Sequence, residues 1–387
     1  MKEILSEGIP DFIKENQKIY YEYFDPDFAD AILRNVISVL DEYYFRTKFI
    51  APEKLHERNN PERPIIYAGN HSGMAFPWDA IIFVANLYKK NANKFQNSVR
   101  ALSAPMLSAS ALMSPFLIEN FWKRVGCIDA TMENFETMMH QKDWNVLIYP
   151  EGVPGIAKGF NNRYKLQQFS TSFLRMSIKY QTDIVFVATV NAEYINPYSY
   201  NSRALDKIVQ VAGIPFIPVS ALTPFIIFQP WLFYFGFPAN LTYVVGPRIK
   251  PYEMLPKPLE KIRKPELREL RDEVQRQFQV FLDDSVEKYG KDPYDGMEYL
   301  KTNLKNLNKV PYISPSGWPV LFAEFERRYK KEGNKMELPI GFFDYIKAAF
   351  KNPMAASFYL PILGLIPILM KGYKGNHLDD LKKKHEH

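Results

Sequence analysis

Two short apolar runs, each followed directly by polar residues, constrain the fold of this chain most. Residues 64–68 (Pro-Ile-Ile-Tyr-Ala) and 145–149 (Asn-Val-Leu-Ile-Tyr) have the apolar, β-branched character of buried strands. Asn70-His71 and then Asp79 follow the first run, and Glu151-Gly152 follows the second. Ligands of open α/β sheets collect beyond the carboxyl ends of the strands. We therefore expect His71, Asp79 and Glu151 to converge at one edge of a parallel sheet.

Helical patterns alternate with these strand signals. One pattern comprises Met132, Phe135 and Met139; a second comprises Leu166, Phe169, Phe173 and Leu174, and a further strand is expected at 183–188. Such alternation is typical of βαβ units. It predicts an α/β fold with a mixed, largely parallel sheet flanked by helices, over residues 61–255.

Helical appendages are expected on both sides of this core. In residues 1–60, apolar side chains recur at helical spacing, and residues 44–49 mix aromatics and cations as interfacial helices do. An ordinary packing helix is the alternative there. In residues 256–387, an amphipathic pattern over 267–282 predicts a long helix against the core, and residues 342–350 predict another.

The order and spacing of four blocks resemble the glycerolipid acyltransferase superfamily, which includes lysophosphatidate and glycerol-phosphate acyltransferases. The blocks are 70–79, 126–131 (Gly-Cys-Ile-Asp-Ala-Thr), 149–152 (Tyr-Pro-Glu-Gly) and 183–188. Residues 163–167 also look like a segment of the diacylglycerol-acyltransferase-like branch. Two departures stand out: seven residues separate His71 from Asp79 where the family usually has four, and the second block lacks the Arg that many members use on the acceptor phosphate. The resemblance runs from about residue 64 to residue 251.

This resemblance implies a direct acyl transfer. His71 would take the proton of an acceptor hydroxyl as it attacks a thioester carbonyl, a general-base contribution of ~10²–10⁴-fold. Asp79 would fix the tautomer and orientation of the imidazole, as in serine hydrolase triads. No Gly-x-Ser-x-Gly nucleophile motif is present in the sequence, and direct transfer requires none. The alternative for His71 is a structural histidine without a catalytic role.

The resemblance also implies a set of substrate-binding residues around this dyad. Glu151 and Gly152 would shape the acceptor site. Lys158, Arg163 and Lys165 would contact a phosphate or glycerol head group. For Arg163 and Lys165, the alternative is a solvated loop. The whole predicted set is Asn70, Ser72, Gly73, Glu151, Gly152, Lys158, Arg163 and Lys165. Neither a metal nor a cofactor is implied, because acyl-CoA or acyl carrier protein acts as the donor substrate.

Two apolar segments suggest contact with lipid. Residues 208–247 form forty residues without a charge, and five prolines argue against a spanning helix. We expect loops and short helices that form an acyl-chain groove or an interfacial surface, with Trp231 and Tyr234 at headgroup level; a dry core is the alternative. Residues 352–370 are predicted to be re-entrant or interfacial rather than spanning. Their basic flanks, Lys347, Lys351, Lys371 and Lys374, suit anionic headgroups.

Composition agrees with an enzyme on the cytoplasmic face of a membrane, held by peripheral or re-entrant association. The single cysteine, Cys127, fits a reducing compartment, and the first residues lack the apolar run of a secretory signal. A net charge of +6 over 387 residues, with no visible binding module, argues against nucleic acid as a partner.

Two other functions remain open from the sequence. One is a non-catalytic lipid-binding or lipid-transfer protein, which the lengthened spacing between His71 and Asp79 favours. The other is a lipid or thioester hydrolase that uses the same histidine with water, since exclusion of water decides between transfer and hydrolysis. The acceptor, the donor and the acyl-chain length are not determined by these patterns.

Overall fold

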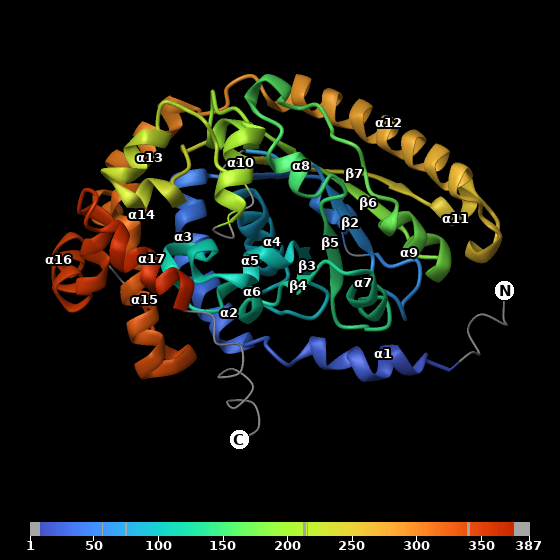
Figure 1. Cartoon of the computed structure of the whole chain (residues 1–387), viewed down its shortest axis with the longest axis horizontal. Coiled ribbons are helices and arrows are strands. Elements are labelled where there is room, and N and C mark those ends of the chain that lie inside the picture. The colour runs from blue at the N-terminus through green and yellow to red at the C-terminus, as the bar shows by residue number, and fades with distance from the viewer. Residues whose placement is uncertain are drawn as a thin grey trace.

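The computed structural model describes residues 8–55, 57–73, 76–211, 214, 216–338 and 341–374. Within these residues the centre of the molecule is a sheet of seven strands (Figure 1). The strands are β1 (Lys48–Ile50), β2 (Ile66–Gly69), β3 (Val99–Ser103), β4 (Ile128–Asp129), β5 (Asn145–Ile148), β6 (Ile184–Val190) and β7 (Thr242–Ile249). Their order across the sheet is β1-β7-β6-β2-β5-β3-β4.

The pairing is parallel throughout except between β6 and β7, which run antiparallel. The expected mixed, largely parallel sheet is therefore confirmed. Strands β2 and β5 are direct neighbours, with Ile66 opposite Val146. Their carboxyl ends consequently lie side by side, which brings the two polar motifs of the sequence to one edge.

Helices surround the sheet and continue beyond it. They are α1 (Asp11–Asn16), α2 (Pro26–Ile32), α3 (Ser38–Leu40), α4 (Trp78–Lys90), α5 (Pro105–Ala109), α6 (Phe121–Arg124), α7 (Met132–Met138), α8 (Val153–Ile156), α9 (Ser172–Tyr180), α10 (Arg203–Gln210), α11 (Pro251–Met254), α12 (Lys264–Tyr289), α13 (Gly296–Lys305), α14 (Val310–Ile313), α15 (Trp318–Glu332), α16 (Phe342–Lys351) and α17 (Leu365–Lys374). Shorter helical turns include η3 (Asp41–Phe45), η5 (Ala111–Met113), η9 (Thr223–Ile227), η10 (Pro230–Tyr234) and η15 (Pro353–Tyr359).

Alternate strand residues point into two apolar layers. Tyr67, Leu147 and Val185 face the layer formed by residues 26–45, α4 and α15. Ile66, Val146 and Phe186 face the layer formed by α7, α9 and α12. The long α12 packs along the sheet beside β6 (Figure 1). The rings of Phe186 and Phe278 stack there with centroids 4.5 Å apart. The sheet is buried on both faces, as parallel sheets require.

Several local expectations need correction. The helix expected from Leu166 onward begins only at Ser172, because residues 165–171 form an extended loop. The aromatic pair Tyr44 and Phe45 is 1% and 0% exposed, so the ordinary packing helix holds there and an interfacial one does not. Tyr234, expected at headgroup level, is likewise fully buried and donates a hydrogen bond to the Leu112 carbonyl at 2.8 Å.

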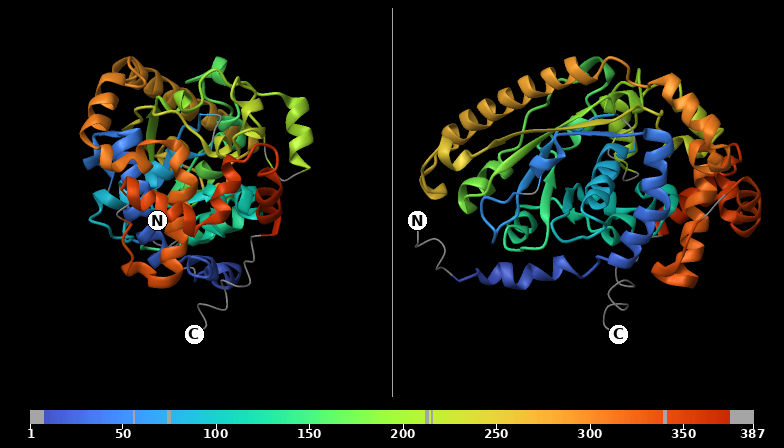
Figure 2. Two further views of the ribbon diagram at one scale, coloured as in Figure 1. Left: turned by 90° about the vertical axis from the view of Figure 1, so that its left-hand side faces the viewer. Right: turned by 180° about the vertical axis from the view of Figure 1, so that it is seen from behind.

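The C-terminal helices α13 to α17 gather at one end of the molecule, away from the far end of α12 (Figures 1 and 2). The described residues of 208–247 form the end of α10, short helical turns and most of β7 instead of one long helix, as the prolines of this segment predict. Within the described part of the chain, no helix has both the length and the apolar character needed to cross a membrane.

Candidate active site

His71 and Asp79 meet at the carboxyl edge of the sheet. His71 lies two residues beyond β2, and Asp79 lies in the first turn of α4. The imidazole Nδ1 is 3.0 Å from Asp79 Oδ2, and the two side chains are 14% and 1% exposed. Since a carboxylate oxygen accepts hydrogen bonds, this contact favours the tautomer in which Nδ1 carries the proton and Nε2 is the acceptor. The seven-residue spacing therefore still allows the contact, although Met74 and Ala75 within it lie outside the described residues.

The first turn of α4 is fixed by two buried side chains. The Tyr243 hydroxyl of β7 donates to the backbone carbonyl of Asp79 at 2.6 Å, and the Trp78 indole donates to the Tyr234 carbonyl at 2.9 Å. Both rings are fully buried. These contacts fix the backbone that carries Asp79. Its carboxylate is therefore already positioned to orient the imidazole.

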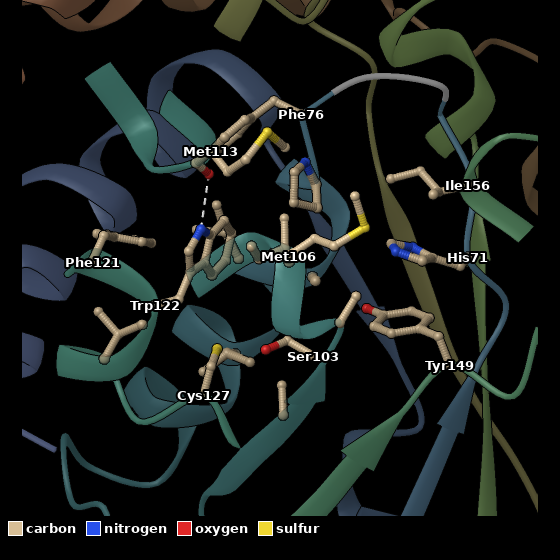
Figure 3. A pocket seen from close by; sticks show the side chains of 18 of the residues that line it. His71, Phe76, Ser103, Met106, Met113, Phe121, Trp122, Cys127, Tyr149 and Ile156 are labelled. Atoms are coloured by element: carbon tan, nitrogen blue, oxygen red, sulfur yellow. Dashed lines mark hydrogen bonds between the residues drawn. The ribbon is translucent and has the colours of Figure 1, made fainter. Parts of the chain in front are cut away.

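The ring of Tyr149 supports the other side of the imidazole. The two rings stack with centroids 4.2 Å apart and planes 25° apart, and both extend into the same cavity (Figure 3). Gly69 makes this stacking possible, because a Cβ at that position would lie 3.0 Å from the Tyr149 ring. Burial raises the pKa of Tyr149 well above its usual value, so the phenol remains protonated.

Glu151 joins the two loops that carry the site. Its Oε1 accepts a hydrogen bond from the His71 backbone N–H at 3.0 Å, and its Oε2 accepts one from the Gln167 N–H at 2.5 Å. Burial raises the pKa of this carboxyl, whereas Lys158 and the two backbone amides act to lower it. Gly155 leaves room for the side chain, since a Cβ there would lie 2.6 Å from Glu151 Cβ. Glu151 thus positions the backbone of the predicted base.

Three further residues of the predicted substrate-binding set lie in the loop after β2. Asn70 is fully buried and exchanges two hydrogen bonds with the Thr189 backbone of β6, at 3.1 and 2.7 Å. Gly73 adopts φ +108°, and a Cβ there would lie 2.9 Å from the Ala192 carbonyl oxygen. Ser72 is 2% exposed. None of the three lines the cavity, so the structure gives them a supporting position.

The predicted cations differ in their surroundings. Lys158 has a side chain only 2% exposed, and its Nζ lies 3.4 Å from Glu193 Oε1, so it forms a buried ion pair instead of facing solvent. The role of Lys158 toward a phosphate or glycerol head group stays a prediction, and its pairing with Glu193 argues against it. Arg163 and Lys165 are exposed on a loop, with the Arg163 guanidinium 5.1 Å from the Phe160 ring centroid. Gly152, with φ +60°, is exposed and lines the cavity.

A mainly apolar cavity of about 470 Å³ opens beside His71. This volume lies within the usual range for small-molecule sites, roughly 300–1,000 Å³. The wall combines residues from β3, α4, α5 and the 214–235 segment; those drawn in Figure 3 include Phe76, Ser103, Met106, Met113, Phe121, Trp122, Cys127 and Ile156. From the segment 208–247, Ile214, Phe216 and Ile226 line this cavity, and its use as an acyl-chain groove stays a prediction. Residues 98–125 also contribute many lining residues, and sequence reasoning did not assign this segment to the site.

Buried polar groups lie at the far part of this cavity. The Arg100 guanidinium donates to the Gly126 and Tyr20 carbonyls at 2.7 Å each and lies 4.9 Å from the Phe24 and Trp144 ring centroids. Burial raises the pKa of Cys127 to about 11, so its thiol is protonated and a poor nucleophile near neutral pH. Within the described residues, no group of three or more His, Cys, Asp or Glu side chains is arranged to hold a metal ion.

Comparison with known proteins agrees with this geometry. Residues 46–190, which carry His71, Asp79 and Glu151, match the family model named Acyltransferase. This match is consistent with the glycerolipid acyltransferase superfamily and supports a transferase role in general. The diacylglycerol-acyltransferase-like branch suggested by residues 163–167 stays a prediction.

Similar full-length proteins carry no assigned activity. The uncharacterized protein ML2427 of Mycobacterium leprae is 24% identical over 202 residues, 52% of this chain and 51% of that protein. The uncharacterized protein Rv0502 of Mycobacterium tuberculosis is 22% identical over 202 residues, 52% of each chain. The match thus spans about half the length of these relatives. No solved structure matches significantly.

Proposed function

We propose that this protein transfers a fatty acyl group from acyl-CoA or acyl carrier protein to a hydroxyl of a lysophospholipid, glycerol phosphate or related lipid. The single observation that carries the proposal is the His71–Asp79 pair at the side of a largely apolar cavity. An oriented imidazole supplies the base, and an apolar cavity of this volume suits an acyl chain.

In the proposed reaction, His71 Nε2 takes the hydroxyl proton while the acceptor oxygen attacks the thioester carbonyl. The new C–O bond forms and the C–S bond breaks. The imidazolium then gives its proton to the leaving thiolate, so the donor departs as a free thiol. The Asp79 carboxylate orients the imidazole and stabilises the imidazolium that forms. Glu151 acts indirectly, through the backbone of His71. Buried, protonated Cys127 is not required as a nucleophile.

The test is transfer by the purified full chain, with labelled long-chain acyl-CoA and, separately, acyl carrier protein as donors. Acceptors are a panel of lysophospholipids, glycerol phosphate and neutral glycerolipids. Labelled lipid formed by the wild type and lost in His71→Ala supports the proposal. Free fatty acid as the sole product would assign a hydrolase, and saturable lipid binding without turnover would assign a lipid-binding protein.

A further inference from the structure

Two distant segments form one exposed apolar surface beside the cavity. We define the apolar platform as Phe225, Ile227 and Phe228 of η9 and its end, together with Leu360, Ile362, Leu363, Ile366, Leu369 and Met370 around α17. Each of these side chains is between 40% and 70% exposed. The Ile362 N–H donates to the Ile227 carbonyl at 2.8 Å, which joins the two segments directly. Scattered single apolar side chains are ordinary on protein surfaces, but a joined group of this size marks an interaction site.

The platform is the outer side of the cavity wall. In η9, Thr223 and Ile226 line the cavity, while Phe225 and Ile227 face outward. Helix α17 packs against η5, whose Met113 also lines the cavity. The Ser110 hydroxyl, just before η5, donates to the Gly372 carbonyl of α17 at 2.9 Å. An apolar molecule resting on the platform therefore contacts η9, which itself lines the cavity, and α17, which packs on the cavity-lining η5.

The residues that directly flank the two platform segments are basic. The segments 208–247 and 352–370 contain no charged residue. Lys207 and Arg248 flank the first segment, and Lys351, which is exposed, and Lys371, which is half-buried, flank the second. The nearest acidic residues along the chain are Asp206 and Asp344. An apolar centre with basic side chains beside it is complementary to a bilayer surface that carries anionic headgroups.

We propose that the apolar platform is a docking surface for a lipid bilayer containing anionic lipid. The large side chains of η9 and α17 enter the boundary between headgroups and acyl chains, and the flanking lysines contact anionic headgroups. Docking in this orientation places the cavity wall against the source of lipid substrate. The delivery of substrate rests on the proposed acyl transfer, whereas the docking itself does not.

The test is co-sedimentation of the purified full chain with vesicles of phosphatidylcholine and phosphatidylglycerol, compared with phosphatidylcholine alone. One variant is taken from each segment, Phe225→Glu and Leu363→Glu, which are 55% and 70% exposed in the wild type. The matched control is Val280→Glu, because Val280 is 58% exposed and belongs to α12, a helix that lies away from α17 (Figure 1). All variants change an exposed side chain, so all should keep the wild-type melting temperature.

We expect the wild type to bind the anionic vesicles more tightly than the neutral ones. Each platform variant should lower vesicle partitioning about tenfold or more, because an apolar side chain that enters the bilayer is replaced by a charge. The control should bind like the wild type. Unchanged binding by both platform variants, or no binding by the wild type, would overturn the proposal.

Two further readouts separate the alternatives. A dimer in ultracentrifugation without vesicles that both platform variants abolish would assign the platform to a second copy of the chain and overturn bilayer docking. Transfer from a water-soluble short-chain thioester to glycerol phosphate should be unaffected by the platform variants. If the wild type binds vesicles but transfers no acyl group to any acceptor, the proposed function fails while the docking surface stands.

Discussion

The substitution Asp79→Asn tests the orientation of the imidazole most selectively. In the wild type, Asp79 Oδ2 lies 3.0 Å from His71 Nδ1, and the backbone of Asp79 is held by Tyr243. Asparagine has the same shape, but its amide N–H₂ favours the tautomer in which Nε2 carries the proton and no longer accepts one. We expect kcat to fall by ~10²–10⁴, or about 3–5 kcal/mol of transition-state stabilisation. KM should change little, because Asp79 does not line the cavity.

The assay is initial-rate acyl transfer over a range of donor concentrations, with thermal unfolding of the same samples. Asp41→Asn is the matched control, since Asp41 is a buried carboxylate of η3 that accepts a hydrogen bond from Thr47 at 2.8 Å, outside the site. In the control, activity should fall only as far as the folded fraction falls. If Asp79→Asn behaves in the same way, Asp79 has only a structural role. Full activity of folded Asp79→Asn would refute the dyad.

Three more predictions follow from the structure. Arg163→Ala or Lys165→Ala should raise KM for a phosphorylated acceptor but not for a neutral one, and equal effects on both in steady-state kinetics would remove the phosphate role. Cys127→Phe fills the deep part of the cavity and should shift the donor preference toward shorter chains; competition between donors of different length measures this, and an unchanged preference would exclude the deep cavity as the acyl site. Burial acts to raise the pKa of Glu324, but hydrogen bonds from two arginines of α15 and from Asn352 lower it to about 2. The carboxylate therefore stabilises the fold above its ordinary pKa near ~4.3, and this contribution is lost as pH falls toward about 2. Glu324→Gln should lower the free energy of unfolding by ~1–3 kcal/mol near neutral pH and make that free energy less dependent on pH in acid, as measured by urea unfolding. The same pH dependence in the variant as in the wild type would contradict this role of Glu324.

The sequence predicted the elements whose signals are local. The apolar runs at 64–68 and 145–149 became β2 and β5, and the pattern over 267–282 became the buried face of α12. Strands β1 and β4 were missed because three and two residues are too short for a periodic signal. Strand β7 was missed because its antiparallel pairing with β6 depends on tertiary contacts more than on its own sequence.

The same distinction applies to the site. The contact between His71 and Asp79 could be predicted, because both belong to one motif with a recognisable pattern. The burial of Lys158 could not, since its partner Glu193 lies 35 residues away along the chain, in the turn after β6. The stacking of Tyr149 on His71 likewise depends on β2 and β5 being neighbours in parallel register. Local patterns locate reactive side chains, and the fold decides which of them face the cavity.

In the proposed mechanism, His71 is the general base for acyl transfer to a hydroxyl. The most direct measurement is the amount of free CoA and of acylated lipid formed in one reaction mixture, for the wild type and for folded His71→Ala. We expect equal amounts of free CoA and acylated lipid from the wild type and loss of both products in the variant. Release of CoA without acylated lipid, or equal transfer by His71→Ala, would contradict this mechanism.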